Sequence, residues 1–230
     1  MKNLRESGIL KRLMSKRFLG AMLNSNGYLA GGAVRAVFTS EPVKDFDIFF
    51  RSREDFDRCL EAIGSTPDDS VTFTQTDTAW THNDGKMLYQ LICAEFGEPA
   101  EVIKKFDFTC CMAAWTGKEF ILDDLFLKHC AQRRLVFNPN AGYPICSAWR
   151  AIKFVKRGWN FPGVEVIKLA LKMHHIKIDT HADLKTQLLG IDTLFLKELT
   201  DALATDGQAV YDFGEALDLL NKFLEEEHDI

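Results

Sequence analysis

Hydrophobic positions in the first 125 residues change repeatedly between helical and strand spacing. Apolar residues at helical spacing predict one amphipathic helix over residues 3–24, which ends at Gly27. Short alternating or continuous apolar runs, separated by turn residues, predict strands between further short helices. The strands are expected at residues 28–30, 44–50, 71–74, 79–82, 87–93, 106–115 and 120–122. This mixture predicts an α+β domain with a mixed β-sheet of four to six strands flanked by helices.

The pattern changes near residue 140, after which only helical spacing recurs. A loop rich in Asn, Pro and Gly over residues 138–142 separates the two parts. Helices are expected at residues 145–158, 163–173, 181–189, 193–203 and 207–227. We therefore expect two domains, an α+β domain over residues 1–140 and an all-helical domain over residues 141–230.

Composition narrows the class of protein without identifying it. Apolar residues make up 47% of the chain and charged residues 27%, which is typical of a globular protein. No apolar run reaches the roughly 18 residues that a membrane span needs, and the N-terminus lacks the apolar segment of a signal peptide. The six cysteines show no CxxC spacing and are expected to be reduced thiols. We expect a cytoplasmic location and no membrane partner.

The net charge of −5 hides an uneven distribution. Six Lys and Arg residues lie within residues 1–17, and seven more lie within residues 148–177. Nine acids with one Lys lie within residues 201–230. Basic segments of this kind are typical of polyanion binding, although each also fits a solvated helix face.

A glycine pair is the first candidate for chemistry. Gly31 and Gly32 follow the strand at residues 28–30 and open a helix that carries Arg35 one turn later. A glycine pair allows backbone N–H groups to approach a phosphate, and a helix N-terminus favours an anion. The pair also fits a turn that needs glycine for its geometry alone.

Two carboxylates form the second candidate. Asp45 and Asp47 lie two residues apart on the strand at 44–50, so both side chains project from one face of the sheet. Two carboxylates on one face repel each other unless a cation lies between them, and Mg²⁺ takes such oxygen ligands together with substrate phosphates. A solvated strand edge or a helix cap would give the same pattern.

The third candidate is Asp107, which stands between Phe106 and Phe108 in the strand expected at 106–115. A charge with apolar neighbours on both sides is costly unless it is paired or metal-bound, although it would also fit the polar face of a half-buried strand. Three acids on neighbouring strands, next to a glycine-rich phosphate turn, predict a two-metal nucleotidyl-transfer site. Arg35 or Lys44 would neutralise phosphate charge there.

These motifs resemble the signature of the polymerase-β-like nucleotidyltransferase superfamily. The likeness is greatest to the head and neck domains of tRNA nucleotidyltransferases (CCA-adding enzymes) and bacterial poly(A) polymerases. Those proteins carry Gly-Gly-x-Val-Arg-Asp, then Asp-x-Asp, then Arg-Asp-Phe-Thr-Ile-Asn-Ala. The matching segments here are LAGGAVRAVF, KDFDIFF, FDFTCCMAAW, FILDDLFLKHCAQRRLVF and CSAWRAIKFVKRGWNF, in the same order between residues 28 and 162.

The resemblance implies a nucleotidyltransferase head followed by a helical neck, with Asp45 and Asp47 as Mg²⁺ ligands. The residues that it places near the nucleotide are Gly31, Gly32 and Arg35 at the triphosphate and Arg150 from the neck. Three positions depart from the family pattern: Ala36 replaces an acid, Phe106 an Arg, and Cys111 an Asn. The Glu-Asp-x-x-Arg element that reads the base in CCA-adding enzymes is absent from the helical half. A compact, phage-type version of the family is therefore the better likeness.

The sequence thus predicts an Mg²⁺-dependent enzyme that transfers a nucleoside monophosphate from an NTP to a hydroxyl group. An RNA 3′ end is the leading acceptor, two metal ions are expected at Asp45, Asp47 and Asp107, and the setting is a bacterial cell or an infected host. Two alternatives stay open. One is transfer to a protein, and the other is a non-catalytic nucleotide- or RNA-binding module on a degenerate nucleotidyltransferase fold.

Overall fold

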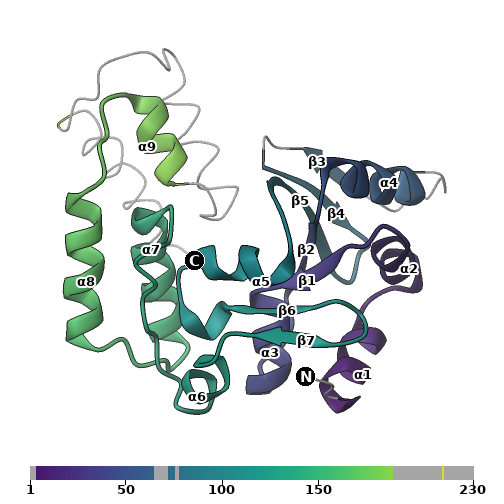
Figure 1. The fold of residues 1–230 in the computed structure, drawn as a ribbon, viewed down its shortest axis with the longest axis horizontal. Coiled ribbons are helices and arrows are strands. Elements are labelled where there is room, and N and C mark those ends of the chain that lie inside the picture. Colours follow the sequence, from purple (N-terminus) through teal and green to yellow (C-terminus); the bar gives the residue numbers. More distant parts are fainter. Residues whose placement is uncertain (1–3, 65–71, 76–77, 189–213, 215–230) are drawn as a thin grey trace. The chain divides into compact units, whose positions relative to one another are not determined.

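The computed structural model describes residues 4–64, 72–75, 78–188 and 214 of the chain. The chain divides into two compact units, residues 1–140 and residues 141–230. The first unit holds a mixed β-sheet with flanking helices, which confirms the predicted α+β class (Figure 1). None of the helices in the described part of the chain has the length and hydropathy that a membrane crossing demands.

In the described part of the chain, seven strands form one sheet in the order β3-β4-β5-β2-β1-β6-β7. Neighbouring strands are antiparallel except for β2 and β5, which are parallel and are joined through α4, β3 and β4. The expected number of four to six strands is wrong, because even the three-residue strands β6 and β7 pair within the same sheet. The strands are β1 Tyr28–Ala30, β2 Asp45–Phe50, β3 Thr72–Gln75, β4 Ala79–Asn83, β5 Leu88–Phe96, β6 Ala113–Trp115 and β7 Phe120–Leu122.

The expected N-terminal helix over residues 3–24 is two helices in the structure. Ser15 adopts an extended backbone conformation, and its Oγ accepts a hydrogen bond from the N–H of Phe18 at 3.3 Å. This N-cap starts a new helix, because a serine side chain satisfies an N–H group that has no partner within the helix. The helices of the first unit are α1 Leu4–Leu13, α2 Lys16–Asn24, α3 Gly32–Thr39, α4 Arg53–Gly64, α5 Pro99–Val102 and α6 Phe126–Ala131, with 3₁₀ helices η1 Ile103–Lys105 and η2 Thr109–Cys111.

The strand expected over residues 106–115 is wrong for most of its length. Only Ala113–Trp115 forms a strand, and the preceding residues form a bend, a single bridge from Phe108 to Phe137, and η2. The side chain of Asn138 donates hydrogen bonds to the carbonyl oxygens of Lys104 and Phe106 at 2.7 and 2.8 Å. These bonds replace a strand partner, so the bend can persist despite residues that favour strands.

One face of the sheet is covered by helices α2 and α4. Phe46 and Tyr89 are fully buried there, and the ring of Phe18 from α2 stacks on Tyr89 at 3.8 Å between centroids. From α4, Phe56 packs edge-on against Phe50 at 5.5 Å. The alternation of β2 thus turns Phe46, Ile48 and Phe50 toward this core.

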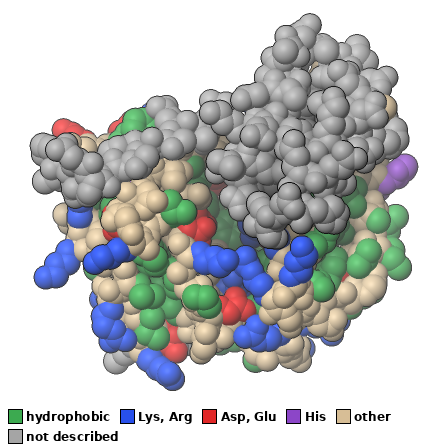
Figure 2. All heavy atoms as spheres, turned by 180° about the vertical axis from the view of Figure 1, so that it is seen from behind, with side chains coloured by type: hydrophobic (Ala, Val, Ile, Leu, Met, Phe, Trp, Pro, Cys, Tyr) green, Lys and Arg blue, Asp and Glu red, His purple; other side chains and the backbone are tan. Residues whose placement is uncertain are grey.

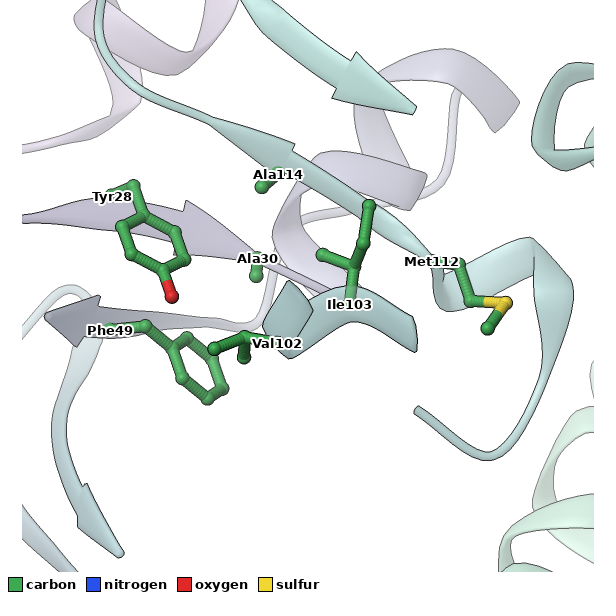
Figure 3. Close-up of a cluster of buried hydrophobic side chains, with 7 residues drawn as sticks. All are labelled: Tyr28, Ala30, Phe49, Val102, Ile103, Met112 and Ala114. Atoms are coloured by element: carbon green, nitrogen blue, oxygen red, sulfur yellow. The ribbon is translucent and has the colours of Figure 1, made fainter. Parts of the chain in front are cut away.

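The opposite face is covered at one end by α5 and η1. Figure 3 shows Val102 and Ile103 from this segment lying over Tyr28, Ala30 and Phe49 of the sheet. Farther along the same face, β5 presents Leu88, which is 37% exposed, and the half-buried Gln90. The helical cover therefore ends before the first residues of β2.

The described part of the second unit consists of helices. Helices α7 Pro144–Lys156 and α8 Gly163–His174 pack together. The ring of Trp159, which lies between the two helices in the sequence, contacts the ring of Phe154, with 5.4 Å between their centroids. Thr180 and Asp183 form a reciprocal capping box at the start of the third helix. The expected helices at 193–203 and 207–227 lie outside the described residues. The observed helices are α7 Pro144–Lys156, α8 Gly163–His174 and α9 His181–Gln187.

Candidate functional site

Asp45 and Asp47 occupy the first and third positions of β2 and are both partly exposed. Phe46 and Ile48, which alternate with them, are fully buried on the opposite face. The two carboxylates therefore share the face that α5 and η1 leave uncovered at this end. Two carboxylates on one face are a donor set that fits Mg²⁺, which takes hard oxygen ligands.

Gln90 is the neighbour of Asp47 that sequence patterns did not reveal. In the parallel pairing of β2 with β5, Asp45 lies beside Leu88 and Asp47 beside Gln90. Gln90 is half-buried and shares the face of the two carboxylates. The sequence predicted the strand but contained no signal for its register, so this neighbour could not be found from it.

The glycine turn lies at the same edge of the sheet. Because β1 and β2 are antiparallel, the end of β1 meets the start of β2, and Gly31 follows β1 directly. Gly31 has φ 75° and ψ −124°, a conformation that only glycine adopts readily. Its N–H donates to the carbonyl oxygen of Ala113 at 3.0 Å, so the amides left to meet an anion begin at Gly32 in the first turn of α3.

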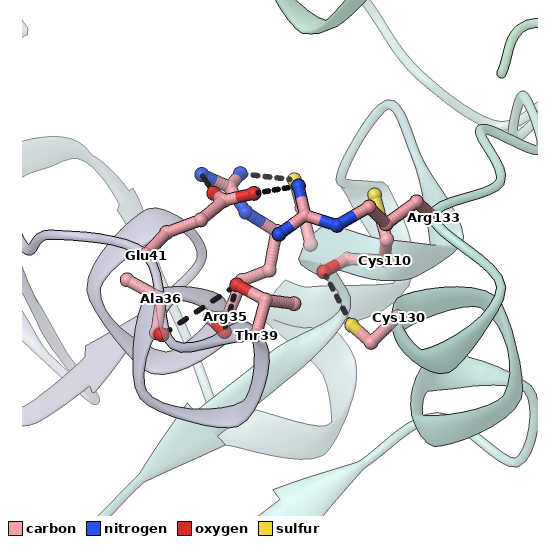
Figure 4. Close-up of polar contacts among 8 residues, drawn as sticks. Arg35, Ala36, Thr39, Glu41, Cys110, Cys130 and Arg133 are labelled. Atoms are coloured by element: carbon pink, nitrogen blue, oxygen red, sulfur yellow. Dashed lines mark hydrogen bonds and ion pairs between the residues drawn. The ribbon is translucent and has the colours of Figure 1, made fainter. Parts of the chain in front are cut away.

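Arg35 is buried, with 7% of its surface exposed. Its Nη2 lies 3.3 Å from Oε2 of Glu41 (Figure 4). Its Nη1 donates to Sγ of Cys111 at 3.5 Å. Arg133 also binds Glu41, at 3.1 Å. Burial lowers the pKa of Arg35, but the sulfur atoms of Cys111 and Cys110 and the carboxylate of Glu41 together raise it above its ordinary value. The guanidinium is thus held by α3 and its neighbours, and its contact with a triphosphate stays a prediction.

Asp107 lies in the bend before η2 and not on a strand, which corrects the expected arrangement of three acids on neighbouring strands. Its Oδ1 accepts a hydrogen bond from the N–H of Phe108 at 3.0 Å. The ring of the preceding residue, Phe106, packs against Phe49 at 5.6 Å and would lie 3.3 Å from a Cβ at Gly31. The bend therefore lies against the glycine turn.

The described residues do not form a ready-made metal cage. Within residues 4–64, 72–75 and 78–188, no group of three or more His, Cys, Asp or Glu side chains is arranged to hold a metal ion. Asp45 and Asp47 remain the donor pair on the open face, where phosphate oxygens of a substrate would complete the ligand set. Lys44 is exposed directly before β2, and Arg150 is half-buried in α7 of the second unit.

The family comparison identifies relatives among phage proteins. The family model described as "Gabija anti-defense 2 family protein" matches residues 4–133. A curated protein, "Gabija anti-defense 2" of Bacillus phage SPbetaL7, is 30% identical over 189 residues. The match covers 81% of this chain and 47% of that protein, so the chain spans about half the length of its curated relative.

Solved structures with the same fold include CCA-adding enzymes. A CCA-adding enzyme in complex with ATP gives a TM-score of 0.58 at 12% identity, covering 96% of this chain and 72% of that one. The Thermotoga maritima enzyme complexed with tRNA gives 0.53 at 12% identity, covering 96% and 61%. The Bacillus stearothermophilus enzyme in complex with CTP gives 0.51 at 16% identity, covering 82% and 52%. At these identities the likeness establishes the fold.

Proposed function

The chain belongs to the Gabija anti-defense 2 family, and we propose that it acts against a bacterial defence as an Mg²⁺-dependent nucleotidyltransferase. The observation that carries this proposal is the shared edge of the sheet. There, Asp45 and Asp47 stand on an open face beside the Gly31 turn. The fold shared with enzymes solved with ATP and CTP supports the same reading.

Each of the residues at this edge would have a separate role in the transfer reaction. Asp45 and Asp47 would hold Mg²⁺ through their carboxylate oxygens. When bound, the ion supplies charge neutralisation for the triphosphate and a lower pKa for the acceptor hydroxyl. Backbone amides from Gly32 onward, at the positive end of α3, donate hydrogen bonds to phosphate oxygens. Lys44 adds a positive charge at the start of β2, close to the developing charge.

An RNA 3′ hydroxyl is the proposed acceptor, and a CCA-adding enzyme of the same fold that was solved in complex with tRNA supports the choice of RNA. The transfer forms a bond between this oxygen and the α-phosphorus of the NTP, and it breaks the bond between the α-phosphorus and the bridging oxygen. The acceptor hydroxyl releases its proton to water, and pyrophosphate leaves with the electron pair of the broken bond. The setting proposed for this reaction is the infected bacterial cell, which fits the phage origin of the curated relative.

The substitution Asp47→Asn tests the proposal, with Asp57→Asn as the matched control. Asp57 is an exposed residue of α4 that pairs with Arg53 at 3.0 Å, far from any proposed role in catalysis. Labelled NTP, Mg²⁺ and total cellular RNA report the transfer. We expect Asp47→Asn to lower the rate about 100-fold or more, since a catalytic metal contributes several kcal/mol. Equal rates of transfer in the two variants would refute the proposal that Asp47 takes part in catalysis.

Two observations favour a second candidate, a non-catalytic module that binds a nucleotide or RNA. Asp107 lies outside the sheet, and Arg35 is engaged by Glu41 and Cys111. A phage-protection assay in cells that carry the Gabija defence separates the candidates. Protection that is lost with Asp47→Asn supports catalysis, whereas protection that this variant retains supports binding alone. If the label of the NTP is found on a protein instead of RNA in the transfer assay, the acceptor is a protein.

A further inference from the structure

The basic N-terminal segment has no part in the proposed reaction, yet the fold uses it to line a cleft. A cleft of about 430 Å³ lies where α1 ends, α2 begins and the β4–β5 turn passes beneath them. We call it the α1–α2 cleft. Its lining residues are Arg12, Leu13, Met14, Ser15, Arg17, Phe18, Asp84, Lys86, Met87 and Tyr89.

Positive charge predominates in this lining, with three cations against one carboxylate. Arg12 and Arg17 come from the two helices, and Lys86 comes from the β4–β5 turn about seventy residues later. The carboxylate of Asp84 keeps its negative charge while its Oδ1 accepts the N–H groups of Lys86 and Met87 at 3.0 and 2.8 Å, so the lining stays net positive. The fold thus brings together three like charges from separate segments, which favours an anionic ligand.

A backbone carbonyl holds one of these three charges, that of Arg17, in place. The Arg17 guanidinium donates to the carbonyl oxygen of Ile63, and the hydroxyl of Tyr89 accepts the N–H of Ser15 at 2.8 Å. Ser15 caps α2, whose N-terminus adds a partial positive charge at the same point. The pKa of His82, which pairs with the lining residue Tyr89 across β4 and β5, is lowered to about 4 by burial and by the charge of Arg17. Both the helix end and the side chains therefore contribute positive potential.

The surface beside the cleft is also basic. Figure 2 shows Lys and Arg side chains gathered over the region of α1 and α2, seen at the lower left of that view. The exposed cations of these two helices are Arg5, Lys11, Arg12 and Lys16. Exposed cations on both helices that line the cleft fit an extended polyanion better than a single small anion.

The cleft adjoins the candidate catalytic edge. Lys86 lies two residues before Leu88, and Leu88 pairs with Asp45 across β2 and β5. At about 3.3 Å per strand residue, Lys86 lies within about 7 Å along the chain of the residue that flanks Asp45. Tyr89, which lines the cleft, projects from the face of the sheet opposite to Asp45 and Asp47, so the cleft and the two carboxylates share one end of the sheet. A single strand of nucleic acid that leaves the cleft over this end, past Leu88, would reach the two carboxylates.

We propose that the α1–α2 cleft binds the phosphodiester backbone of the RNA acceptor and directs its 3′ end to the edge of the sheet at Asp45. This inference rests on the proposed nucleotidyl transfer to RNA. The cleft supplies affinity without reading sequence, because it offers charges and backbone groups to phosphates. The charged rim at Arg12 and Lys86 makes the first contacts, and Arg17 holds the phosphate farther in.

The test compares two double variants of the full chain that remove the same charge. Arg12→Gln with Lys86→Gln removes two cations of the cleft, and Lys118→Gln with Lys128→Gln removes two exposed cations outside the cleft and outside α1 and α2. Fluorescence anisotropy measures binding of a labelled single-stranded RNA across a range of salt concentrations. Two lost phosphate contacts lower the slope of log K against log salt by about 1.4, which is roughly 25-fold in affinity at about 0.1 M salt relative to 1 M.

We expect this loss in the cleft variant and near wild-type binding in the control. Equal losses in both variants would show diffuse attraction only and would overturn the site, as would unchanged binding in the cleft variant. ATP binding, measured separately by titration, should be equal in both variants, and a selective loss in the cleft variant would reassign the cleft to the NTP. If Asp47→Asn leaves nucleotidyl transfer unchanged but RNA binding still depends on the cleft, the proposed catalytic function is refuted. The proposal that the α1–α2 cleft binds RNA is then still supported.

Discussion

His82 provides a sharp test of how burial and charge act together in the first unit. It is fully buried on β4, and its ring meets the ring of Phe18 edge-on at 5.2 Å. Burial, followed by the positive charge of Arg17, lowers its pKa from 6.5 to about 4. The folded state therefore keeps His82 neutral over a pH range in which the unfolded chain protonates it.

The sign and size of the effect follow from proton linkage. Between about pH 6.5 and about pH 4 the unfolded state binds more protons at His82 than the folded state does. As far as His82 is concerned, the free energy of unfolding is therefore highest above this pH range and falls as pH decreases through it. For these two pKa values, this one group lowers the free energy of unfolding by about 2 kcal/mol between about pH 7 and about pH 5. That is a substantial part of the stability of an ordinary domain.

The assay measures the free energy of unfolding by urea denaturation at both pH values, for wild type, His82→Phe and His174→Gln. His174 is an exposed residue of α8 and serves as the control. Phenylalanine removes the titrating group and keeps an aromatic ring against Phe18. We expect the loss between the two pH values to be about 2 kcal/mol smaller in His82→Phe than in wild type, and unchanged in His174→Gln. If the free energy of unfolding decreases as much between the two pH values in His82→Phe as in wild type, the reasoning is refuted.

Two further substitutions test the structure around the glycine turn. Gly31→Ala should destabilise the protein by about 2 kcal/mol or more, because φ is positive and an aromatic ring lies 3.3 Å from the new Cβ. Gly32→Ala, where a Cβ meets nothing within 4 Å, should leave the thermal midpoint equal or higher; equal effects at both positions would contradict the argument. Glu41→Gln should cost about 1–3 kcal/mol, because it leaves the buried charge of Arg35 without its carboxylate. The same change at exposed Glu119 should alter the midpoint little, and a similar drop there would refute this account.

Local patterning predicted the elements that carry the candidate carboxylates. The alternation of Asp45 and Asp47 with buried Phe46 and Ile48 is a property of any strand with one covered face, so it could be read from the sequence. The break at Ser15 was also encoded locally, since serine is a preferred N-cap, but a continuous apolar stripe concealed it.

Contacts between distant segments could not be predicted in the same way. Asn138 satisfies the carbonyl of Phe106 from more than thirty residues away, and this bond turns an expected strand into a bend. The placement of Gln90 beside Asp47 depends on the register of two parallel strands. The ion pair of Arg35 with Glu41 depends on the left-handed turn at Ser40, which returns the chain toward α3. Each of these features arises from tertiary structure that local propensity does not specify.

The hydrogen bond from Gly31 to Ala113 has a consequence for how the protein folds. It joins residues that are 82 positions apart in the sequence, and the paired residues Asp45 and Leu88 are 43 positions apart. Contacts so distant in sequence form slowly, because a long stretch of chain must lose its freedom before they contribute. The glycine turn and the carboxylate strand therefore acquire their final geometry late in folding, after β5 and β6 have joined the sheet. A short peptide that contains the glycine turn and both aspartates would lack the partners that shape this edge.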